Sequence, residues 1–270
     1  SMLRSISLLF FLSMSITTFG QRNIVSSGPM LQDKFPKKSG SLRASKFSIN
    51  LGRIKNNEVK YDTLFLLNEG LQPISFTVYM HNASDNLFPA HLKITPKDTV
   101  LMPGKESYLA IRYDAAKIDD HGFVLDRCVL MTTDLETPSK QFSITAFLIE
   151  DFPAMTAEDS AVVQKASVPV TIVDYGTVQA GRKVSRSVMI YNNGKKDLLI
   201  HKAKSNGPGI DIIFSKNTVP AGDSSQVNIE FSTFGKIGVN NRLISIFMND
   251  PAMPEVKIQL NGTVAEGKKD

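Results

Sequence analysis

Apolar and polar residues alternate one by one along several stretches of the chain. Residues 184–191 read "VSRSVMIY", residues 227–232 read "VNIEFS" and residues 256–261 read "VKIQLN". Successive side chains of a β-strand point to opposite faces, so this period of two places one face of each stretch on a core and the other in water. A helix, with its period of 3.6, would not bury these sets on one side. The pattern therefore predicts half-buried β-strands.

The alternating stretches occur in two copies. Residues 49–76 read "INLGRIKNNEVKYDTLFLLNEGLQPISF", and residues 173–200, shifted by 124 positions, read "VDYGTVQAGRKVSRSVMIYNNGKKDLLI". Further along, "LMPGKESYLAIRY" parallels "VPAGDSSQVNIEF", and "CVLMTTD" parallels "ISIFMND". Each copy spans about 105 residues, far more than the period of about 20–50 residues typical of solenoid repeats. We therefore expect each copy to be a domain with its own core.

Turn-forming residues separate the alternating stretches in both copies. Asn193-Gly194 suits a tight turn that needs a positive φ, and Glu69-Gly70 supplies the same conformation through its glycine. The segments "MPGK" and "PAGD" place Pro and Gly before the next strand. Short strands at about 10-residue spacing, with no long helical stretch between them, are typical of antiparallel sandwiches. The predicted fold class is all-β, with two tandem immunoglobulin-like antiparallel β-sandwiches of about seven strands each.

The repeat also predicts the boundaries of the domains. We place the first sandwich at residues 45–150, a linker at 151–165 and the second sandwich at 166–266. The segment "MTAEDSAVVQKA" has helical character, and Thr156 with Asp159 gives it a weak capping-box pattern.

Two glycines, Gly52 and Gly176, occupy the same place in the two copies, just after a short strand. A glycine there predicts a bend or bulge in an edge strand. The alternative is a close approach of the backbone to a ligand.

The first 20 residues have the pattern of a secretory signal peptide. Arg4 precedes an apolar stretch at residues 6–16, and Thr18 and Gly20 supply the small residues for cleavage before Gln21. The apolar stretch is shorter than the roughly 20 residues that a membrane-spanning helix needs, although an uncleaved anchor remains the alternative. This predicts an exported protein, periplasmic or extracellular in a bacterial envelope, with no stable membrane span after cleavage.

Basic residues are concentrated in a segment that we predict to be a flexible leader, residues 21–44. Residues 21–46 hold six Lys or Arg against one Asp, whereas the chain from Phe47 onward holds 24 basic and 25 acidic residues. A nucleic-acid-binding protein carries its basic patch on the folded surface, so we expect no nucleic-acid partner. The leader is expected to be a solvated tether, with contact to an anionic surface as the alternative.

The order of these motifs resembles a known family. The motifs are "NLGRI", "LFLLNEG", "LMPGK" and "LAIRY" in the first copy, and "DYGTV", "VMIYNNG", "VPAGD" and "VNIEF" in the second. Together they resemble the immunoglobulin-like repeats of the abnormal-spindle/Hydin type, relatives of major sperm protein domains. The closer resemblance is to a bacterial exported family known as a domain of unknown function. The resemblance implies non-catalytic modules that make protein contacts.

One feature of that family is missing. Many members carry a Cys-Gly-Cys-Thr-like stretch where this chain reads "HNASDN" in the first copy and "KSNGPG" in the second. No disulfide, metal or redox role tied to that stretch carries over to this chain.

The remaining residues form no recognisable catalytic pattern. The chain has four histidines: His81, His91, His121 and His201. None stands in an HExxH or His-x-His motif, and no Cys-x-x-Cys occurs. "DDHG", residues 119–122, is the best local metal candidate, but we interpret it as a polar loop. The one cysteine, Cys128, lies in a strand-like stretch and is expected to be a buried, inert thiol. We therefore predict no enzyme, no cofactor, and no catalytic, cofactor-binding or metal-binding residues.

Three functions remain open from the sequence. The leading hypothesis is a non-catalytic exported interaction or scaffold module, which binds another exported or envelope protein through exposed edge strands. The first alternative is a periplasmic pilus-assembly-type chaperone that donates a strand to a partner subunit, which a fixed L-shape with a buried basic pair would favour. The second alternative is a carbohydrate-binding module, which the absence of Trp disfavours. The identity of the partner, the binding surface and the oligomeric state stay open.

Overall fold

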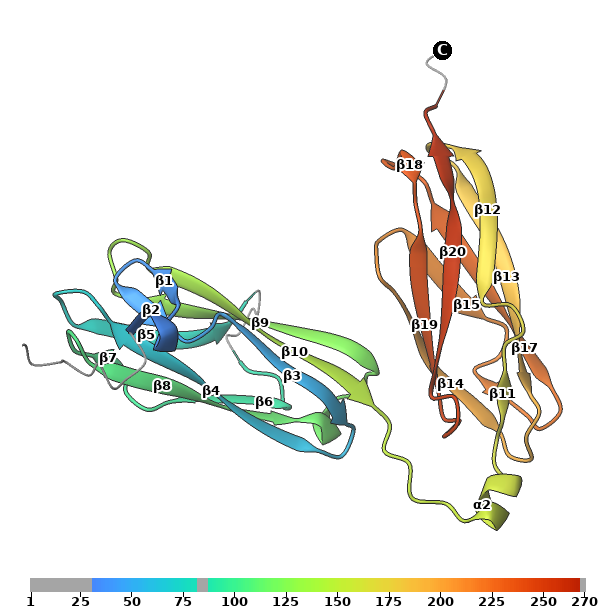
Figure 1. Ribbon diagram of the computed structural model, residues 1–270, viewed down its shortest axis with the longest axis horizontal. Helices are drawn as coiled ribbons and strands as arrows, with labels where there is room; N and C mark the ends of the chain where they lie inside the picture. The colour runs from blue at the N-terminus through green and yellow to red at the C-terminus, as the bar shows by residue number, and fades with distance from the viewer. Residues whose placement is uncertain (1–30, 82–86, 268–270) are drawn as a thin grey trace, which may run out of the picture.

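The computed structural model describes residues 31–81 and 87–267, and almost all of its regular structure is β-strand. Figure 1 shows two elongated sandwiches joined by one connecting segment, with β1–β10 in the first domain and β11–β20 in the second. The predicted all-β class is confirmed. Within the described ranges, no helix is long and apolar enough to span a membrane. The predicted signal peptide lies outside the described residues.

Two five-stranded sheets form the first domain, with the orders β1-β2-β4-β8-β6 and β3-β10-β9-β5-β7. A short helix α1 (Leu31–Lys34) precedes the first strand and a 3-10 turn (Ala115–Lys117) follows β8. The strands are β1 (Lys37–Ser39), β2 (Leu42–Ala44), β3 (Ser48–Lys55), β4 (Val59–Asn68), β5 (Ile74–Met80), β6 (Leu92–Pro96), β7 (Val100–Leu101), β8 (Glu106–Asp114), β9 (Gly122–Thr132) and β10 (Ser139–Ile149).

The second domain repeats this arrangement, with sheets of order β11-β13-β17-β15 and β12-β20-β19-β14-β16, and with β18 paired to β20. The strands are β11 (Ala166–Ser167), β12 (Ile172–Gln179), β13 (Lys183–Asn192), β14 (Leu198–Ser205), β15 (Ile210–Phe214), β16 (Thr218–Val219), β17 (Ser224–Ser232), β18 (Gly238–Val239), β19 (Arg242–Met248) and β20 (Glu255–Ala265). Among the described residues, seven strands of each domain have five residues or more, and three short strands extend the sheets.

Strand pairing departs from the prediction at one place in each domain. The described pairs are antiparallel except β3 with β10 and β12 with β20, which run parallel. In both cases the first long strand of a domain adds to the outside of its last strand. Strands that run parallel cannot be joined by a short turn. In each domain these two strands are therefore neighbours in the sheet although they lie far apart in the chain.

Each domain has its own core, built from alternate residues of the long strands. The alternate buried positions of β8 and of its counterpart β17 are Ser107, Leu109, Ile111 and Tyr113, and Ser225, Val227, Ile229 and Phe231; Asp114, at the end of β8, is buried as well. The two buried clusters share no residue. Full burial of an aliphatic or aromatic side chain contributes about 1.5–3 kcal/mol each, so the alternating pattern seen in the sequence is what stabilises both sandwiches.

The Asn-x-Gly motif makes the same buried corner in both domains. The side-chain amide of Asn68 donates to the carbonyl oxygens of Gln72 (2.7 Å) and Leu101 (2.9 Å), and its Oδ1 accepts from the N–H of Gly70 (2.9 Å). Asn192 makes the same three bonds to the equivalent groups of the second domain. Both asparagines are fully buried, so each satisfies main-chain groups that would otherwise be orphaned in the core.

The predicted bends at Gly52 and Gly176 are present. Both glycines have φ of 72°, a conformation that side chains with a Cβ rarely adopt. The pairing register of β3 with β10 and of β12 with β20 shifts at these positions, as expected of β-bulges. The bulge places Tyr175 directly over Gly262, where a Cβ would collide with its ring.

The first domain begins earlier than residue 45, inside the predicted leader. Strand β2 pairs with β1 and with β4, and Phe35, Leu42 and Ala44 are fully buried. Four basic residues of residues 31–46 form ion pairs, for example Arg43 with Glu69 at 2.8 Å and Lys46 with Asp62 at 2.6 Å. Three-residue strands are too short to show a clear alternation, which explains the error. Residues 21–30 lie outside the described residues.

The predicted helical segment of the linker is a five-residue helix, α2 (Ala157–Ala161). The hydroxyl of Thr156 accepts from the N–H of Asp159 (3.1 Å), and the Asp159 carboxylate accepts from the N–H of Thr156 (3.2 Å), which completes the capping box. In Figure 1 this segment lies at the corner of an L formed by the two domains, which approach each other near β10 and β14.

Candidate interaction edge

Edge strands differ in how many of their main-chain N–H and C=O groups remain available for pairing with another strand. Each sandwich has one five-residue strand at the end of a sheet in equivalent positions, β6 in the first domain and β15 in the second. A sheet edge is a template for pairing with another strand unless the protein blocks it. The two strands therefore allow a direct comparison of a blocked edge with an open one.

Strand β15 leaves three main-chain N–H groups directed away from its sheet. Its register on β17 is fixed by bonds from the N–H of Ser215 to Gln226 O (2.9 Å) and from the N–H of Ser232 to Gly209 O (2.8 Å). In an antiparallel ladder the hydrogen-bonded positions alternate, so the N–H groups of residues 210, 212 and 214 face outward. Within the described residues none of these three N–H groups has a hydrogen-bond partner.

The side chains of β15 are apolar and partly exposed. Its sequence is "IDIIF", in which residues 210, 212 and 214 are half-buried and residues 211 and 213 are exposed. Ile213 is 56% exposed. β15 thus combines open main chain with apolar side chains.

Strand β6 is protected at the equivalent positions. The N–H of Leu92 donates to Pro89 O (2.9 Å), and Pro96 has no N–H to offer. Only the N–H of Ile94 faces outward without such protection. The exposed residues of β6 are Lys93 and Thr95 in place of Asp211 and Ile213. Proline and lysine are the residues with which natural sheets prevent edge-to-edge association.

Strand β12 lies at the end of the other sheet of the second domain, and like β6 it is protected against the addition of another strand. Its bulge at Gly176 interrupts the ladder. The guanidinium of Arg186 reaches over the strand and donates to Asp174 O (3.4 Å) and Tyr175 O (3.1 Å). Bulges and covering side chains both prevent strand addition, so β15 is the more accessible of the two.

An exposed apolar loop borders the start of β15. Residues 233–237 connect β17 to β18, and Phe234 is 81% exposed while Ile237 is also exposed. Lys236, in the same loop, extends toward Gly209 and lies over the ring of Phe231. The β15 edge and this 233–237 loop together make up the candidate surface, and they meet where Lys236 reaches Gly209.

The single cysteine behaves as predicted. Cys128 is fully buried, its Sγ lies 3.8 Å from the Sδ of Met80, and burial raises the pKa of its thiol to about 12. Such a thiol is protonated and unreactive at neutral pH.

Two of the four histidines come together in space, which the sequence did not indicate. His121 of the "DDHG" loop, before β9, stacks on His201 of β14 with ring centroids 4.4 Å apart. His91 lies elsewhere, with Nε2 3.0 Å from Asp126. Eighty residues separate the two stacked histidines along the chain, so no local motif connects them.

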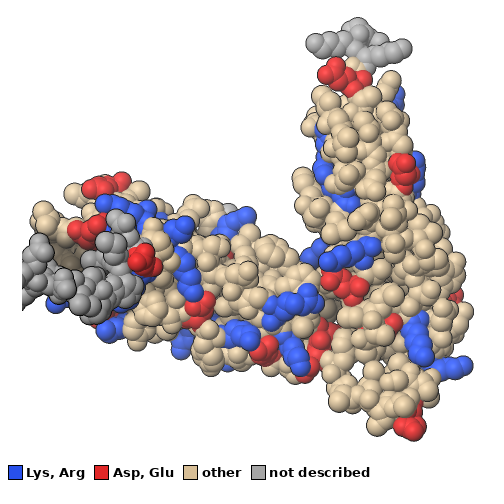
Figure 2. All heavy atoms as spheres, in the orientation of Figure 1, with Lys and Arg blue, Asp and Glu red and all other residues tan. Residues whose placement is uncertain are grey.

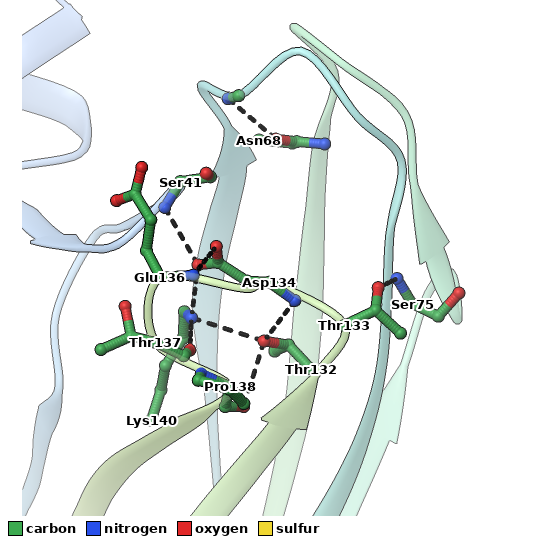
Figure 3. Close-up of polar contacts among 11 residues, drawn as sticks. Ser41, Asn68, Ser75, Thr132, Thr133, Asp134, Glu136, Thr137, Pro138 and Lys140 are labelled. Carbon is green, nitrogen blue, oxygen red and sulfur yellow. Dashed lines mark hydrogen bonds and ion pairs between the residues drawn. The ribbon is translucent and has the colours of Figure 1, made fainter.

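The first domain also contains a buried ion pair that the sequence analysis did not predict. Lys140 donates to Asp134 at 2.8 Å and to the carbonyl of Thr137, and the Asp134 carboxylate also accepts from the N–H of Ser41 (2.9 Å), as Figure 3 shows. The side chains of Lys140 and Asp134 are 1% and 2% exposed. Burial opposes ionisation of Asp134, but the bond from Lys140 and the main-chain N–H groups outweigh it and lower its pKa. The pair therefore fastens the β9–β10 hairpin to the turn between β1 and β2.

Three aromatic residues lie exposed on the outer face of one sheet of the first domain: Tyr61, Phe65 and Tyr108. The rings of Phe65 and Tyr108 stand at 68° to each other. They form no flat platform of the kind that stacks on a sugar ring.

Comparison with known proteins agrees with this fold. Residues 167–264, in the second domain, match the family model described as "Protein of unknown function (DUF1573)". No curated protein matches the chain. The predicted resemblance to a domain of unknown function with immunoglobulin-like repeats is confirmed.

Solved structures share the architecture at low sequence identity. A protein of unknown function from Porphyromonas gingivalis W83 superposes with a TM-score of 0.58 at 17% identity, over 83% of this chain and 100% of the other. PapD-like domain 7 of human CEP192 gives a TM-score of 0.33 at 14% identity, over 44% and 96% of the two chains. The periplasmic chaperone SfaE gives 0.32 at 14% identity, over 83% and 100%. The first of these shows that the fold is shared, and the other two are too distant to carry more.

Proposed function

We propose that this chain is a non-catalytic, exported interaction module whose second domain binds an extended segment of another envelope protein along the β15 edge. One observation carries the proposal. The N–H groups of residues 210, 212 and 214 face outward without partners within the described chain, beside the exposed Ile213. Main-chain pairing supplies affinity in such complexes, and side chains at alternate positions supply specificity.

Charge and burial along β15 indicate what the bound segment looks like. Asp211 lies opposite Glu230 of β17, so two like charges meet on the exposed face. A basic residue of the partner beside Asp211 would relieve their repulsion, because opposite charges on neighbouring strands stabilise a sheet. An apolar residue beside Ile213 would bury its side chain. The preferred partner is therefore an extended segment with a basic and an apolar residue two positions apart.

The 233–237 loop is needed as well as the strand. A few added main-chain hydrogen bonds contribute about 0.5–1.5 kcal/mol each, whereas association costs about 4–15 kcal/mol. Burial of Phe234 and Ile237 adds apolar area at about 25 cal/mol per Å². We therefore expect the partner to cover this loop in addition to pairing with β15.

Site-specific photocrosslinking of the full chain in its native envelope tests the proposal. A photoreactive residue at position 213 is expected to give an adduct with one protein, because this side chain flanks the paired edge. The matched control is position 95 on β6, the equivalent place on the protected edge, where we expect no adduct. Equal adducts from both positions would contradict the proposal.

A proline variant then tests main-chain pairing itself. Ile212→Pro removes one outward N–H without breaking the ladder to β17, and we expect it to abolish the adduct at position 213. Ile94→Pro makes the equivalent change on β6 and is expected to leave the adduct intact. A folded Ile212→Pro protein that still forms the full adduct would exclude strand addition at β15.

The observations do not favour the two alternatives over this proposal. The L-shaped arrangement is compatible with a pilus-assembly-type chaperone, but the lysines at the junction, Lys202 and Lys204, both pair with Asp120 and are partly exposed. They are not a buried basic pair free to bind a subunit. The tilted rings of Phe65 and Tyr108 weaken the carbohydrate-binding alternative.

A further inference from the structure

The two domains contact each other through close-packed and charged groups. Gly122, at the start of β9, packs against the ring of Phe247 of β19 so closely that a Cβ would collide with it. Asp120 accepts from Lys202 (2.8 Å) and Lys204 (3.0 Å), and Lys204 also donates to Phe123 O. In Figure 2 basic and acidic side chains lie side by side where the domains meet.

Within this junction lies a group of three metal-binding side chains. His121 and Glu150 come from the first domain and His201 comes from the second, and one ligand atom of each lies within 4.8 Å of the others. His201 Nε2 is 2.9 Å from the Glu150 carboxylate, and the two imidazole planes are within 5° of parallel. In the part of the chain that the structure describes, no other group of three His, Cys, Asp or Glu side chains meets this criterion.

A small cavity next to this group is lined by a residue with an unpaired carboxylate oxygen, Glu255. The cavity has a volume of about 20 Å³ and is lined by His121 and Glu150 from the first domain and by Phe247 and Glu255 from the second, among others. A volume of roughly 10–15 Å³ holds one water-sized particle. Oε1 of Glu255 is buried without a hydrogen-bond partner. A buried carboxylate oxygen without a partner is costly, and a cation is one group that would satisfy it.

The charges around the group are nearly balanced. Besides the two lysines held by Asp120, the nearby cation is Arg53, whose guanidinium lies over the ring of Phe147 at 4.6 Å. Asp119, Asp120, Glu150 and Glu255 supply negative charge. Burial, and then the neighbouring His201, lower the pKa of His121, against the opposing effect of Glu150, Asp120 and Asp119.

We propose that His121, Glu150 and His201 bind one divalent transition-metal ion, preferentially Zn²⁺, which clamps the two domains together. Imidazole nitrogens and a carboxylate oxygen are ligands that Zn²⁺ takes in proteins, with bonds of about 2.0–2.2 Å. Tetrahedral ligand atoms then lie about 3.3 Å apart, so the distances between the ligand atoms change by no more than about 1.5 Å on binding. One imidazole must also rotate out of the parallel stack, so that the nitrogens of both rings point at the ion. The Glu255 carboxylate is placed to complete or support the site from the second domain.

This site differs from the β15 edge in position and in chemistry. It joins residues of both domains, so an ion bound there stabilises the closed junction relative to any open arrangement. Its effect is on the relative placement of the domains and needs no partner protein. Each proposal can therefore fail without the other.

Zinc titration of the full chain, stripped beforehand with a chelator, tests this site. We expect one Zn²⁺ per chain by elemental analysis after dialysis, and a higher midpoint of thermal unfolding with zinc than without. His201→Ala and Glu150→Gln are expected to weaken zinc binding by at least about tenfold, since even residues that only support metal ligands contribute that much. The matched control, His81→Ala, removes an imidazole outside the group and is expected to bind like the parent.

Cobalt provides a second readout that does not depend on any variant. Co²⁺ bound to the parent chain is expected to give the absorption of a four-coordinate nitrogen and oxygen site, and Zn²⁺ is expected to displace it. Absence of this absorption, or equal zinc affinity of the parent and the folded Glu150→Gln protein, would overturn the proposal.

Discussion

The two domains share a frame and differ at their edges. The buried corner of Asn68 recurs at Asn192, and the bulge of Gly52 recurs at Gly176 with the same φ of 72°. By contrast, Pro96 closes the edge of the first domain where Phe214 leaves the equivalent edge of the second open. A duplicated fold keeps the contacts that its core requires, while positions on the rim are free to change. A rim position at which the two copies differ is thus a place to look for a function of one of them.

A second difference concerns the side chains that hold the last hairpin of each domain, β9–β10 and β19–β20, against an early segment of the same domain. Asp134 and Asp250 are equivalent and both accept from a main-chain N–H of an early strand segment, of Ser41 and Ala166 respectively. Only the first domain adds a buried lysine, Lys140, where the second has Val256. The first domain thus uses a charge pair at a place where the second uses an aliphatic side chain.

The largest effect is expected from breaking this pair. Lys140→Met leaves the Asp134 carboxylate buried without its cation, which typically costs about 3–5 kcal/mol. Denaturant unfolding of the full chain, followed with a probe in each domain, measures the loss in the first domain alone. Val256→Met at the equivalent position is the control, with an expected loss of about 1–3 kcal/mol from overpacking. An equal loss of unfolding free energy in both domains would show that breaking the buried ion pair costs no more than overpacking an aliphatic position.

Gly122→Ala is expected to separate the domains with a smaller cost to each. Gly122 has φ of 71°, and an added methyl would collide with Phe247 across the junction. Small-angle scattering should show a broader distribution of shapes than for the parent chain. Gly104→Ala is the matched control, because Gly104 has φ of 69° but nothing within 4 Å of the added Cβ. Both changes carry a strain of about 1–2 kcal/mol, and only the first should alter the shape.

Acid is expected to weaken the first domain through Asp134. The pKa of Asp134 is lowered in the folded state, so its contribution is present above the unfolded value of about 3.9 and is lost as the pH falls through the lower folded value. Unfolding of the first domain measured between about pH 5 and pH 2 should therefore show a decrease in stability. Asp134→Asn should flatten this dependence. An unchanged slope in that variant would assign the acid sensitivity to another carboxylate.

The smallest effect on stability is expected from Ile213→Lys. Ile213 is exposed, and surface substitutions usually change the free energy of unfolding by no more than about 0.5 kcal/mol. The same change places a charge on the open edge, which disfavours strand addition. We expect unchanged unfolding together with lower partner capture and less self-association. A large loss of stability would mean that Ile213 packs against the protein and is not free to bind.

The fold was largely predictable from the sequence, because period-two alternation and the internal repeat depend only on local side-chain spacing. The capping box of Thr156 and the bulge glycines were found for the same reason, since their signals lie within a few residues. Strands β1 and β2 were missed because three residues such as Leu42–Ala44 cannot display a period.

The candidate sites were much less predictable. Aligning the two copies places Pro96 opposite Phe214, but only the sheet order shows that these residues lie on edges. Lys140 stands in a polar hairpin sequence, and nothing local indicates that it is buried. His121 and His201 meet only because the two domains pack against each other. In each case the deciding contact joins segments far apart in the chain.

Residue-resolved hydrogen exchange of the free full-length chain tests the open edge most directly. Exchange is expected to alternate along β15, with fast exchange for the amides of residues 210, 212 and 214 and protection for those of Asp211 and Ile213, which bond to β17. Uniform protection of all five amides in the free chain would contradict it, because the edge would then already be occupied.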